Sequence, residues 1–168
     1  MPADIGLKKW TPDDLETLVK YANNTKIADN LTDAFPSPYT MEDGRAYIEG
    51  AMNDSPTKFF AVTYGGEIVG SIGVFPQSDV HRKNAAVAYW IAEPFWGRGI
   101  ATEAIRLVVE YGFSAFDIVR IYAKPFGMNT GSHRALEKAG FTLEARLKNV
   151  IFKNGQLTDE LTYGIRRQ

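Results

Sequence analysis

A turn with two glycines, followed by a helix, is the segment of this chain best suited to chemistry. Trp90 opens an apolar run that Pro94 ends, and Gly97 and Gly99 then lead into a helical pattern over residues 100–111. Glycine lets a backbone approach a ligand closely, because it has no side chain. The first N–H groups of a helix have no acceptor within it and lie at its positive end. The sequence therefore predicts a site for a phosphate or pyrophosphate group at this turn.

Two familiar phosphate-binding motifs do not fit the turn. A P-loop ends in Gly-Lys-Ser/Thr, whereas this turn ends in Gly99, Ile100 and Ala101. A dinucleotide-binding turn has a third glycine, where this chain has Thr102, and an acid after the next strand, whereas Asp117 precedes that strand. Both ligand classes are therefore excluded, and an ordinary tight connection between a strand and a helix is the remaining alternative.

A second segment, residues 129–141, combines helix signals with polar side chains. Asn129 fits a helix cap, Leu136 and Phe141 fit core positions, and Gly140 stands where helices commonly end. A capped amphipathic helix explains most of these residues, but it does not require both Asn129 and Ser132. These two side chains are therefore candidates for contact with a ligand.

The elements that must position both segments follow from turn signals and hydrophobic spacing. Helices are predicted to begin at Thr11 and Thr40, because acids follow each threonine in the first turn. Gly66 and Gly155 complete two-residue turns that are typical of hairpins. The pattern indicates a single α+β domain over residues 1–168. Strands are expected over residues 4–10, 59–64, 67–75, 84–92, 118–123, 143–153 and 157–165, and later helices over residues 100–111 and 129–139.

Composition limits the classes of function. The 168 residues include 19 Lys and Arg and 20 Asp and Glu, and the net charge of −1 gives no electrostatic case for nucleic-acid or membrane binding. The absence of cysteine excludes a disulfide, a thiolate metal site and a cysteine nucleophile. His81 and His133 are too few for a metal cluster. With no signal-peptide pattern and no run of roughly 20 apolar residues, we expect a cytoplasmic protein.

Taken together and in this order, the two segments resemble the GNAT superfamily of acetyl-CoA-dependent N-acetyltransferases. Three phrases carry the resemblance: Tyr-Trp-Ile at residues 89–91, Trp-Gly-Arg-Gly-Ile-Ala-Thr-Glu-Ala at 96–104 and Leu-Glu-Lys-Ala-Gly-Phe at 136–141. Within the superfamily, the wording is close to the branch of ribosomal-protein alanine N-acetyltransferases. The resemblance covers nearly the whole chain. It implies a mixed, mostly antiparallel central sheet flanked by about four helices.

The resemblance also implies a ligand, acetyl-CoA as the acetyl donor, with no metal. Residues 89–92 would pair through their backbone with the pantetheine arm, and Pro94 would end that pairing because it has no N–H. Asn129 would contact the arm, and Ser132 would lie near the sulfur. Backbone N–H groups of the glycine turn would hold the pyrophosphate, namely those of Gly97, Arg98, Gly99, Ile100, Ala101 and Thr102.

Acetyl transfer to nitrogen needs a neutral amine, a stabilised oxyanion and a proton for the departing thiolate. Without cysteine no acetyl-cysteine intermediate can form, so we expect direct attack in a ternary complex. Backbone N–H groups near Ile91 and Ala92 are the predicted oxyanion donors. Ser132 is the candidate to protonate the thiolate, directly or through water. Its alternative role is a hydroxyl bonded to the helix backbone.

Two positions depart from the wording of the family. Trp96 stands where the general phosphate motif opens with Gln or Arg, as is common in this branch. Ala86 stands about where the branch often carries a glutamate, so the most obvious general base is missing. The remaining candidates for the base are His81, Glu93, Asp159, Glu160 and a chain of water molecules.

The missing glutamate favours an acceptor amine of low pKa. An α-amino group has a reference pKa of about 7.7–8.0, against about 10.4 for lysine, so more of it is neutral at pH 7. The expected acceptor is a primary amine of a small molecule or a protein N-terminus, bound beside residues 35–39 and the final hairpin. The alternative function is a catalytically weak acyl-CoA-binding regulatory module, and a longer acyl group is a further option. The chain is expected to be a monomer or a homodimer.

Overall fold

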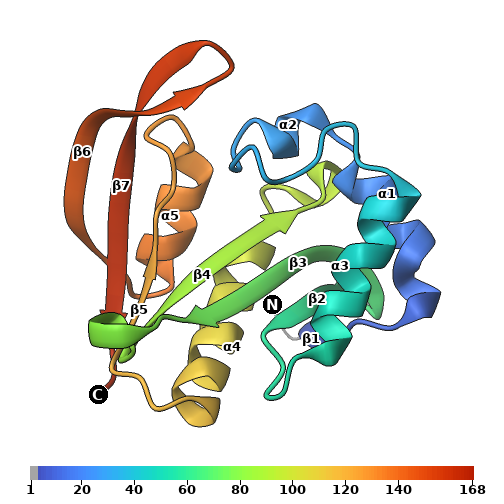
Figure 1. The fold of residues 1–168 in the computed structure, drawn as a ribbon, viewed down its shortest axis with the longest axis horizontal. Helices are drawn as coiled ribbons and strands as arrows, with labels where there is room; N and C mark the ends of the chain where they lie inside the picture. Colours follow the sequence, from blue (N-terminus) through green and yellow to red (C-terminus); the bar gives the residue numbers. More distant parts are fainter. Residues whose placement is uncertain (1–3) are drawn as a thin grey trace.

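The computed structural model describes residues 4–168, which form a seven-stranded sheet with helices on both faces (Figure 1). The strand order is β1-β2-β3-β4-β5-β7-β6, and only β4 and β5 run parallel to each other. The predicted mixed, mostly antiparallel sheet is therefore confirmed. The strands are β1 (Ile5–Lys9), β2 (Phe59–Tyr64), β3 (Glu67–Pro76), β4 (Asn84–Ile91), β5 (Arg120–Ala123), β6 (Thr142–Lys153) and β7 (Gln156–Arg166).

Within residues 4–168, five helices flank the sheet, where about four were expected. The additional helix is α2, which has four residues and is too short to show a hydrophobic period in the sequence. None of the helices within residues 4–168 is long and apolar enough to cross a membrane. The helices are α1 (Leu15–Ala22), α2 (Thr25–Ala28), α3 (Met41–Asn53), α4 (Ile100–Ala115) and α5 (Thr130–Lys138), with short 3-10 turns at Pro12–Asp14, Asp79–His81 and Glu93–Phe95.

Helix α3 begins where the sequence predicts, directly after Thr40, whereas the segment after Thr11 starts as a 3-10 turn and α1 begins at Leu15. The hydroxyl of Thr40 accepts a hydrogen bond from the Asp43 N–H at 3.2 Å. The Asp43 carboxylate in turn accepts one from the Thr40 N–H at 2.9 Å. Each side chain thereby satisfies a backbone donor that the helix itself leaves without an acceptor.

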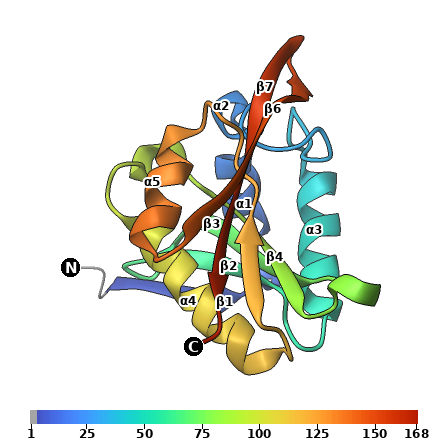
Figure 2. The same ribbon diagram turned by 90° about the vertical axis from the view of Figure 1, so that its left-hand side faces the viewer.

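Helices α4 and α5 lie on one side of the sheet and α3 on the other (Figure 2), and each face of the sheet packs against its own hydrophobic cluster. Val87 and Ile91 of β4 belong to the cluster beneath α4 and α5. Trp90, between them in the strand register, packs instead with the cluster beneath α1 and α3. Because side chains alternate along a strand, β4 contributes to both layers. We call the two sides of the sheet the α4 side and the α3 side.

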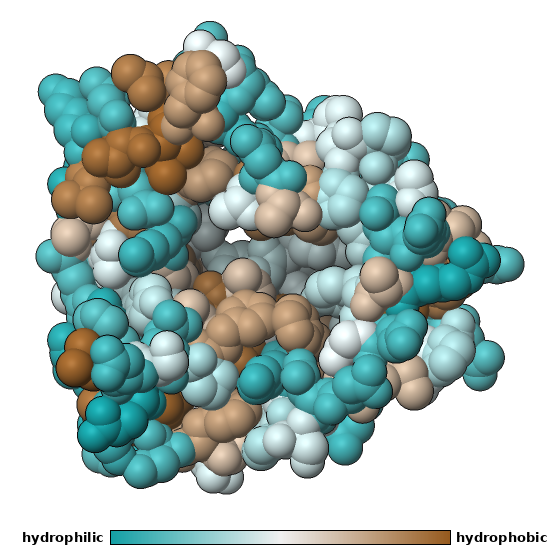
Figure 3. Space-filling view, viewed as in Figure 1, coloured by the Kyte–Doolittle hydropathy of each residue, from teal (hydrophilic) through white to brown (hydrophobic). Residues whose placement is uncertain are grey.

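The sheet opens between β4 and β5, and this opening positions the candidate site. The parallel pairing runs only from Asn84–Arg120 to Ala86–Tyr122. Beyond it β4 continues beside β3, while β5 pairs with β7. Across the opening, the tip of the β6–β7 hairpin reaches the segment after α2, where Lys153 Nζ lies 2.9 Å from Asp33 Oδ1. Figure 3 shows a hollow near the middle of this face, where Figure 1 places the opening between β4 and α5.

Candidate active site

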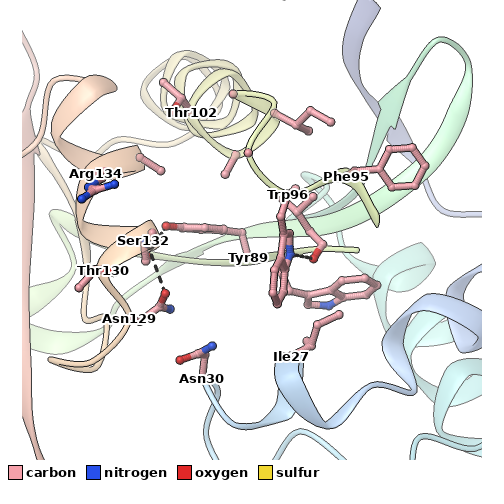
Figure 4. Close-up of a pocket in the computed structure, with 18 of the residues that line it drawn as sticks. Ile27, Asn30, Tyr89, Phe95, Trp96, Thr102, Asn129, Thr130, Ser132 and Arg134 are labelled. Carbon is pink, nitrogen blue, oxygen red and sulfur yellow. Dashed lines mark hydrogen bonds between the residues drawn. The ribbon is translucent and has the colours of Figure 1, made fainter. Parts of the chain in front are cut away.

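A cavity of about 540 Å³ lies on the α4 side of the opening, between β4 and the first turns of α4 and α5 (Figure 4). Tyr89 comes from β4, Trp96 and Thr102 from the glycine turn and α4, and Ser132 from α5. Of the residues that the sequence placed at the site, all but Ala92 and Arg98 border this cavity. Those that border it are Ile91, Gly97, Gly99, Ile100, Ala101, Thr102, Asn129 and Ser132.

The glycine turn presents unpaired backbone donors to this cavity. Gly97 and Gly99 have φ angles of 79° and 76°, in the left-handed region that favours glycine. The first helical bond of α4 runs from the Glu103 N–H to the Gly99 carbonyl at 3.3 Å. The N–H groups before Glu103 therefore have no acceptor within the helix. No atom lies within 4 Å of where a Cβ would stand at either glycine, so the turn is open to a ligand.

Basic side chains surround the same cavity. Lys26 of α2 and Arg134 and Lys138 of α5 all line it. Arg134 and Lys138 are four residues apart and therefore share a helix face, a spacing that would have predicted them. Lys26 lies in α2, a helix too short to be predicted from the sequence, so its place at the cavity could not be predicted either. The donors of the glycine turn and these cations together fit the phosphates of coenzyme A. Within residues 4–168, no group of three or more carboxylates and histidines is arranged to hold a metal ion.

The backbone of β4 offers further donors on its open edge. The Ala92 N–H donates to the Val69 carbonyl at 2.7 Å, within the ladder to β3. In an antiparallel pair, alternate residues direct their N–H groups to opposite sides, so the N–H groups of Tyr89 and Ile91 face the opening. Trp96 Nε1 donates to the Ile91 carbonyl at 2.7 Å and holds the glycine turn against the end of β4. Of the two predicted oxyanion donors, Ala92 is thus engaged within the sheet.

Two hydroxyl groups meet at the inner end of the cavity. The side chains of Tyr89 and Ser132 share a hydrogen bond (Figure 4). Burial raises the pKa of Tyr89 to about 12, although the hydrogen bond with Ser132 opposes the shift. The Ser132 N–H donates to Asn129 Oδ1 at 3.3 Å, so Asn129 caps α5 and leaves its amide NH₂ for another acceptor. Tyr89 was missed as a site residue, although the alternation of Val87, Tyr89 and Ile91 assigns it to this face.

Two candidates for the general base lie away from the hydroxyl pair or are engaged elsewhere. His81 is exposed in the 3-10 turn before β4, and roughly 16 Å of strand separate Asn84 from Tyr89. Glu93 accepts hydrogen bonds from Lys26 Nζ at 2.7 Å and Asn24 Nδ2 at 2.9 Å. These bonds, from Lys26 first, lower the pKa of Glu93, which makes it a weaker base.

The other two candidates lie on β7. Asp159 accepts hydrogen bonds from the Asn149 N–H at 3.0 Å and from Arg146 Nε at 2.8 Å. The bond from the Asn149 backbone, followed by that from Arg146, lowers the pKa of Asp159. Glu160 is partly buried beside Phe126. Neither carboxylate lines the cavity that holds the hydroxyl pair.

A second cavity, of about 660 Å³, lies on the α3 side of the sheet. It adjoins the first, because Leu31, Tyr89 and Trp90 line both. Phe35 and Tyr39, in the loop expected to line the acceptor side, border it. The final hairpin, also expected there, contributes no residue to the lining and instead contacts the segment around α2.

Comparisons with known proteins assign the family. The acetyltransferase (GNAT) domain model matches residues 4–142. The SPbeta prophage-derived uncharacterized N-acetyltransferase YokL of Bacillus subtilis (strain 168) is 29% identical over 168 residues, covering 95% of this chain and 93% of the relative. The chain therefore belongs to the GNAT family, and its class of enzyme is that of the acetyl-CoA-dependent N-acetyltransferases.

Solved structures of acetyltransferases share the fold. The microcin C7 self-immunity acetyltransferase MccE, in complex with acetyl-CoA and AMP, has a TM-score of 0.80 and 28% identity, covering 98% of this chain and 93% of that chain. The ribosomal L7/L12 alpha-N-protein acetyltransferase RimL, in complex with coenzyme A, has a TM-score of 0.84 and 20% identity, covering 97% and 94%. The fold implied by the sequence resemblance is thus confirmed.

Proposed function

We propose that the protein transfers the acetyl group of acetyl-CoA to a primary amine by direct attack in a ternary complex. One observation carries the proposal: the Tyr89–Ser132 hydroxyl pair lies in the same cavity as the open glycine turn. A phosphate-binding helix start and a proton donor are thereby combined in a single cleft. The amine reaches this cleft from the adjoining α3-side cavity.

The donor lies along the α4 side of the opening. N–H groups of residues 97–102 hold the pyrophosphate, and Arg134 and Lys138 add positive charge around it. The pantetheine arm pairs with the open edge of β4, with the amide of Asn129 as a further donor. This path directs the thioester towards the hydroxyl pair.

Backbone and side-chain groups of this protein take part in each step of acetyl transfer. The neutral amine nitrogen attacks the thioester carbonyl carbon, and the N–H of Ile91 stabilises the oxyanion. The carbon–sulfur bond breaks, and the leaving thiolate takes the proton of Ser132, which Tyr89 replaces. The acetylated nitrogen gives its extra proton to water, and water returns a proton to Tyr89, so the transfer neither consumes nor releases a proton overall. The high pKa of Tyr89 keeps the hydroxyl pair protonated at neutral pH.

The acceptor class follows from the absence of a well-placed base. Ala86, on the α3 side of β4, carries no carboxylate, and water is a weak base. An amine that is partly neutral near pH 7, such as a peptide α-amino group, is therefore favoured over a lysine side chain. RimL, described as an alpha-N-protein acetyltransferase, acts on an amine of this kind.

The test combines binding with turnover. Calorimetry with acetyl-CoA measures donor binding, and free coenzyme A release measures transfer to a panel of peptides and small amines. Saturable binding together with amine-dependent release supports the proposal. Binding without release on any amine would instead indicate an acyl-CoA-binding regulatory module, and absence of binding would refute the site assignment altogether.

A further inference from the structure

The α3-side cavity points to a narrower class of acceptor, an inference that rests on the proposed function. We propose that the preferred acceptor is a primary amine joined by a short aliphatic linker to an aromatic group. This group fills the α3-side cavity while the nitrogen reaches the thioester. Polyamines and other polycations are disfavoured by the same cavity.

The position of the cavity makes it the natural place for the body of the acceptor. Trp90 and Tyr89 line both cavities, so a molecule whose nitrogen lies near the hydroxyl pair continues past β4 onto the α3 side. Ala88 of β4 also lines the α3-side cavity, and its small, exposed side chain leaves this path open. The volume of about 660 Å³ lies within the range of roughly 300–1,000 Å³ typical of small-molecule pockets.

The walls of this cavity are aromatic. The rings lie against one another in two series, with centroids 4.8–6.4 Å apart and mostly edge-to-face. Such geometry leaves further ring faces and edges to which an aromatic ligand can pack. One series is Trp90, Phe35 and Tyr39, and the other is Tyr47, Phe59 and Phe75.

Gly73 lets the rings of Phe75 and Phe59 lie directly against β3. A Cβ at Gly73 would lie 2.6 Å from Phe75 Cζ and 3.2 Å from Phe59 Cδ1. The first distance is shorter than real contacts allow, so a larger residue would displace a ring that lines the cavity. The cavity is thus shaped by its aromatic side chains.

The polar groups of the cavity are few and already engaged. Asp43 is the single charged residue in its lining, and its Oδ2 accepts hydrogen bonds from the Thr40 N–H at 2.9 Å and hydroxyl at 2.8 Å. Ser71, which is 2% exposed, shares a 2.6 Å hydrogen bond with Tyr47. A polyamine would bring several ammonium groups into a site with one carboxylate, and burying unpaired charge is costly.

Two kinds of molecule carry a primary amine close to an aromatic ring. A free arylalkylamine and a peptide with an aromatic first residue both carry a primary amine a few bonds from a ring. The two differ in basicity, because a free arylalkylamine is about as basic as a lysine side chain, so the low-pKa preference of the proposed function favours the peptide. They also differ at the carbon that bears the amine, which in a peptide carries the backbone that must enter the opening. Phenethylamine and a tripeptide beginning with phenylalanine therefore serve as the two aromatic probes, with ethylamine, spermidine and a serine-initiated tripeptide for comparison.

The first experiment measures kcat/KM of each probe by coenzyme A release, with the acetylated product identified by mass spectrometry. We expect phenethylamine to exceed ethylamine, and the phenylalanine peptide to exceed the serine peptide, by about tenfold or more. The aromatic probe that is turned over faster identifies the kind of acceptor. Equal rates for phenethylamine and ethylamine, or a preference for spermidine, overturn the aromatic class alone. Turnover of no amine overturns the proposed function itself.

The second experiment fills the cavity from α3. Ala46 is exposed on this helix and lines the cavity, so Ala46→Leu adds bulk there without disturbing the core. Its control is Arg45→Leu, at the neighbouring exposed position, which lies outside the lining. Ala46→Leu should raise KM for phenethylamine by about fivefold or more, whereas Arg45→Leu should leave this KM unchanged. An unchanged KM for phenethylamine in Ala46→Leu, with its helical content intact, contradicts the proposal.

Discussion

The hydroxyl of Tyr89 and the Oγ of Ser132 share a hydrogen bond that joins β4 to α5 across the opening in the sheet. The two residues are 43 positions apart, so only the folded chain brings them together. Tyr89 stands on the strand expected to hold the donor arm, and Ser132 stands one turn into the helix beside it. The hydroxyl pair that we propose as the proton donor is therefore held in a fixed position relative to the open edge of β4.

Removing either hydroxyl should slow transfer more than it weakens donor binding. Ser132→Ala is expected to lower kcat about 100-fold, because the thiolate loses its proton donor, and to leave the acetyl-CoA Kd within about threefold. Tyr89→Phe should lower kcat about tenfold, since Ser132 remains but is no longer replenished. The double variant should be little worse than Ser132→Ala, because the hydroxyls act as one unit.

Steady-state kinetics and calorimetry measure these effects, and Thr130→Ala is the matched control. Thr130 lines the same cavity as Ser132 but is not part of the hydroxyl pair. Its removal should leave kcat near the wild-type value. If Ser132→Ala retained the wild-type kcat, Ser132 would have only its structural role at the start of α5.

The raised pKa of Tyr89 also predicts how stability depends on pH. The pKa of Tyr89 is about 12 in the folded protein, against an ordinary value of 10.0. The folded state therefore holds the proton more tightly, and the stability that this group contributes is complete below pH 10. This contribution, about 3 kcal/mol in total, is lost as the pH rises from 10 through 12, because the tyrosine of the unfolded state ionises first.

Denaturant unfolding at a series of pH values tests this dependence. The wild-type free energy of unfolding should fall more steeply above pH 10 than that of Tyr89→Phe, so the gap between the two should narrow. Other buried tyrosines ionise in both proteins, and their effect cancels in the difference. If the difference in unfolding free energy between the two proteins stayed constant to pH 11.5, burial would not raise the pKa of Tyr89.

Much of the fold could be predicted because its signals are local. The turn at Gly66 and the turn at Gly155 separate strands whose observed bounds lie within a residue or two of those expected. The threonine cap at Thr40 likewise marks the start of α3. Each signal depends on neighbours in the sequence, so no knowledge of tertiary contacts was needed.

The rest of the site depends on contacts between distant segments. The sequence pointed to Ser132 but not to its partner Tyr89, because the pair forms only when α5 packs beside β4. The sequence around Asp43 predicts a helix cap. The cavity next to Asp43 forms only where the loop over residues 31–39 packs nearby, and the local sequence does not predict that packing. Lys26 was missed for a simpler reason, since α2 has four residues and no recognisable period.

The left-handed backbone of Gly99 predicts a selective loss of donor binding. With φ at 76°, a valine would strain the turn, while no atom within 4 Å would clash with its Cβ. Gly99→Val should therefore weaken coenzyme A binding by about 100-fold or more and leave the fold largely intact. Gly131→Ala is the control, because Gly131 lines the same cavity with a φ outside this region and open space around it. Unchanged affinity for Gly99→Val by calorimetry would refute the pyrophosphate site.

Trp96 should matter for donor binding through its indole N–H. Trp96 Nε1 donates to the Ile91 carbonyl at 2.7 Å, which fixes the glycine turn against the end of β4. Trp96→Phe keeps an aromatic ring but removes this bond, at a cost of about 1 kcal/mol. The lost bond no longer fixes the glycine turn relative to β4, so acetyl-CoA should bind more weakly. We expect KM for acetyl-CoA to rise about fivefold, with kcat nearly unchanged. Trp96→His, whose ring nitrogen can donate to the same carbonyl, should recover part of the loss. Equal KM values for wild type and Trp96→Phe would mean that the turn holds its position without the indole.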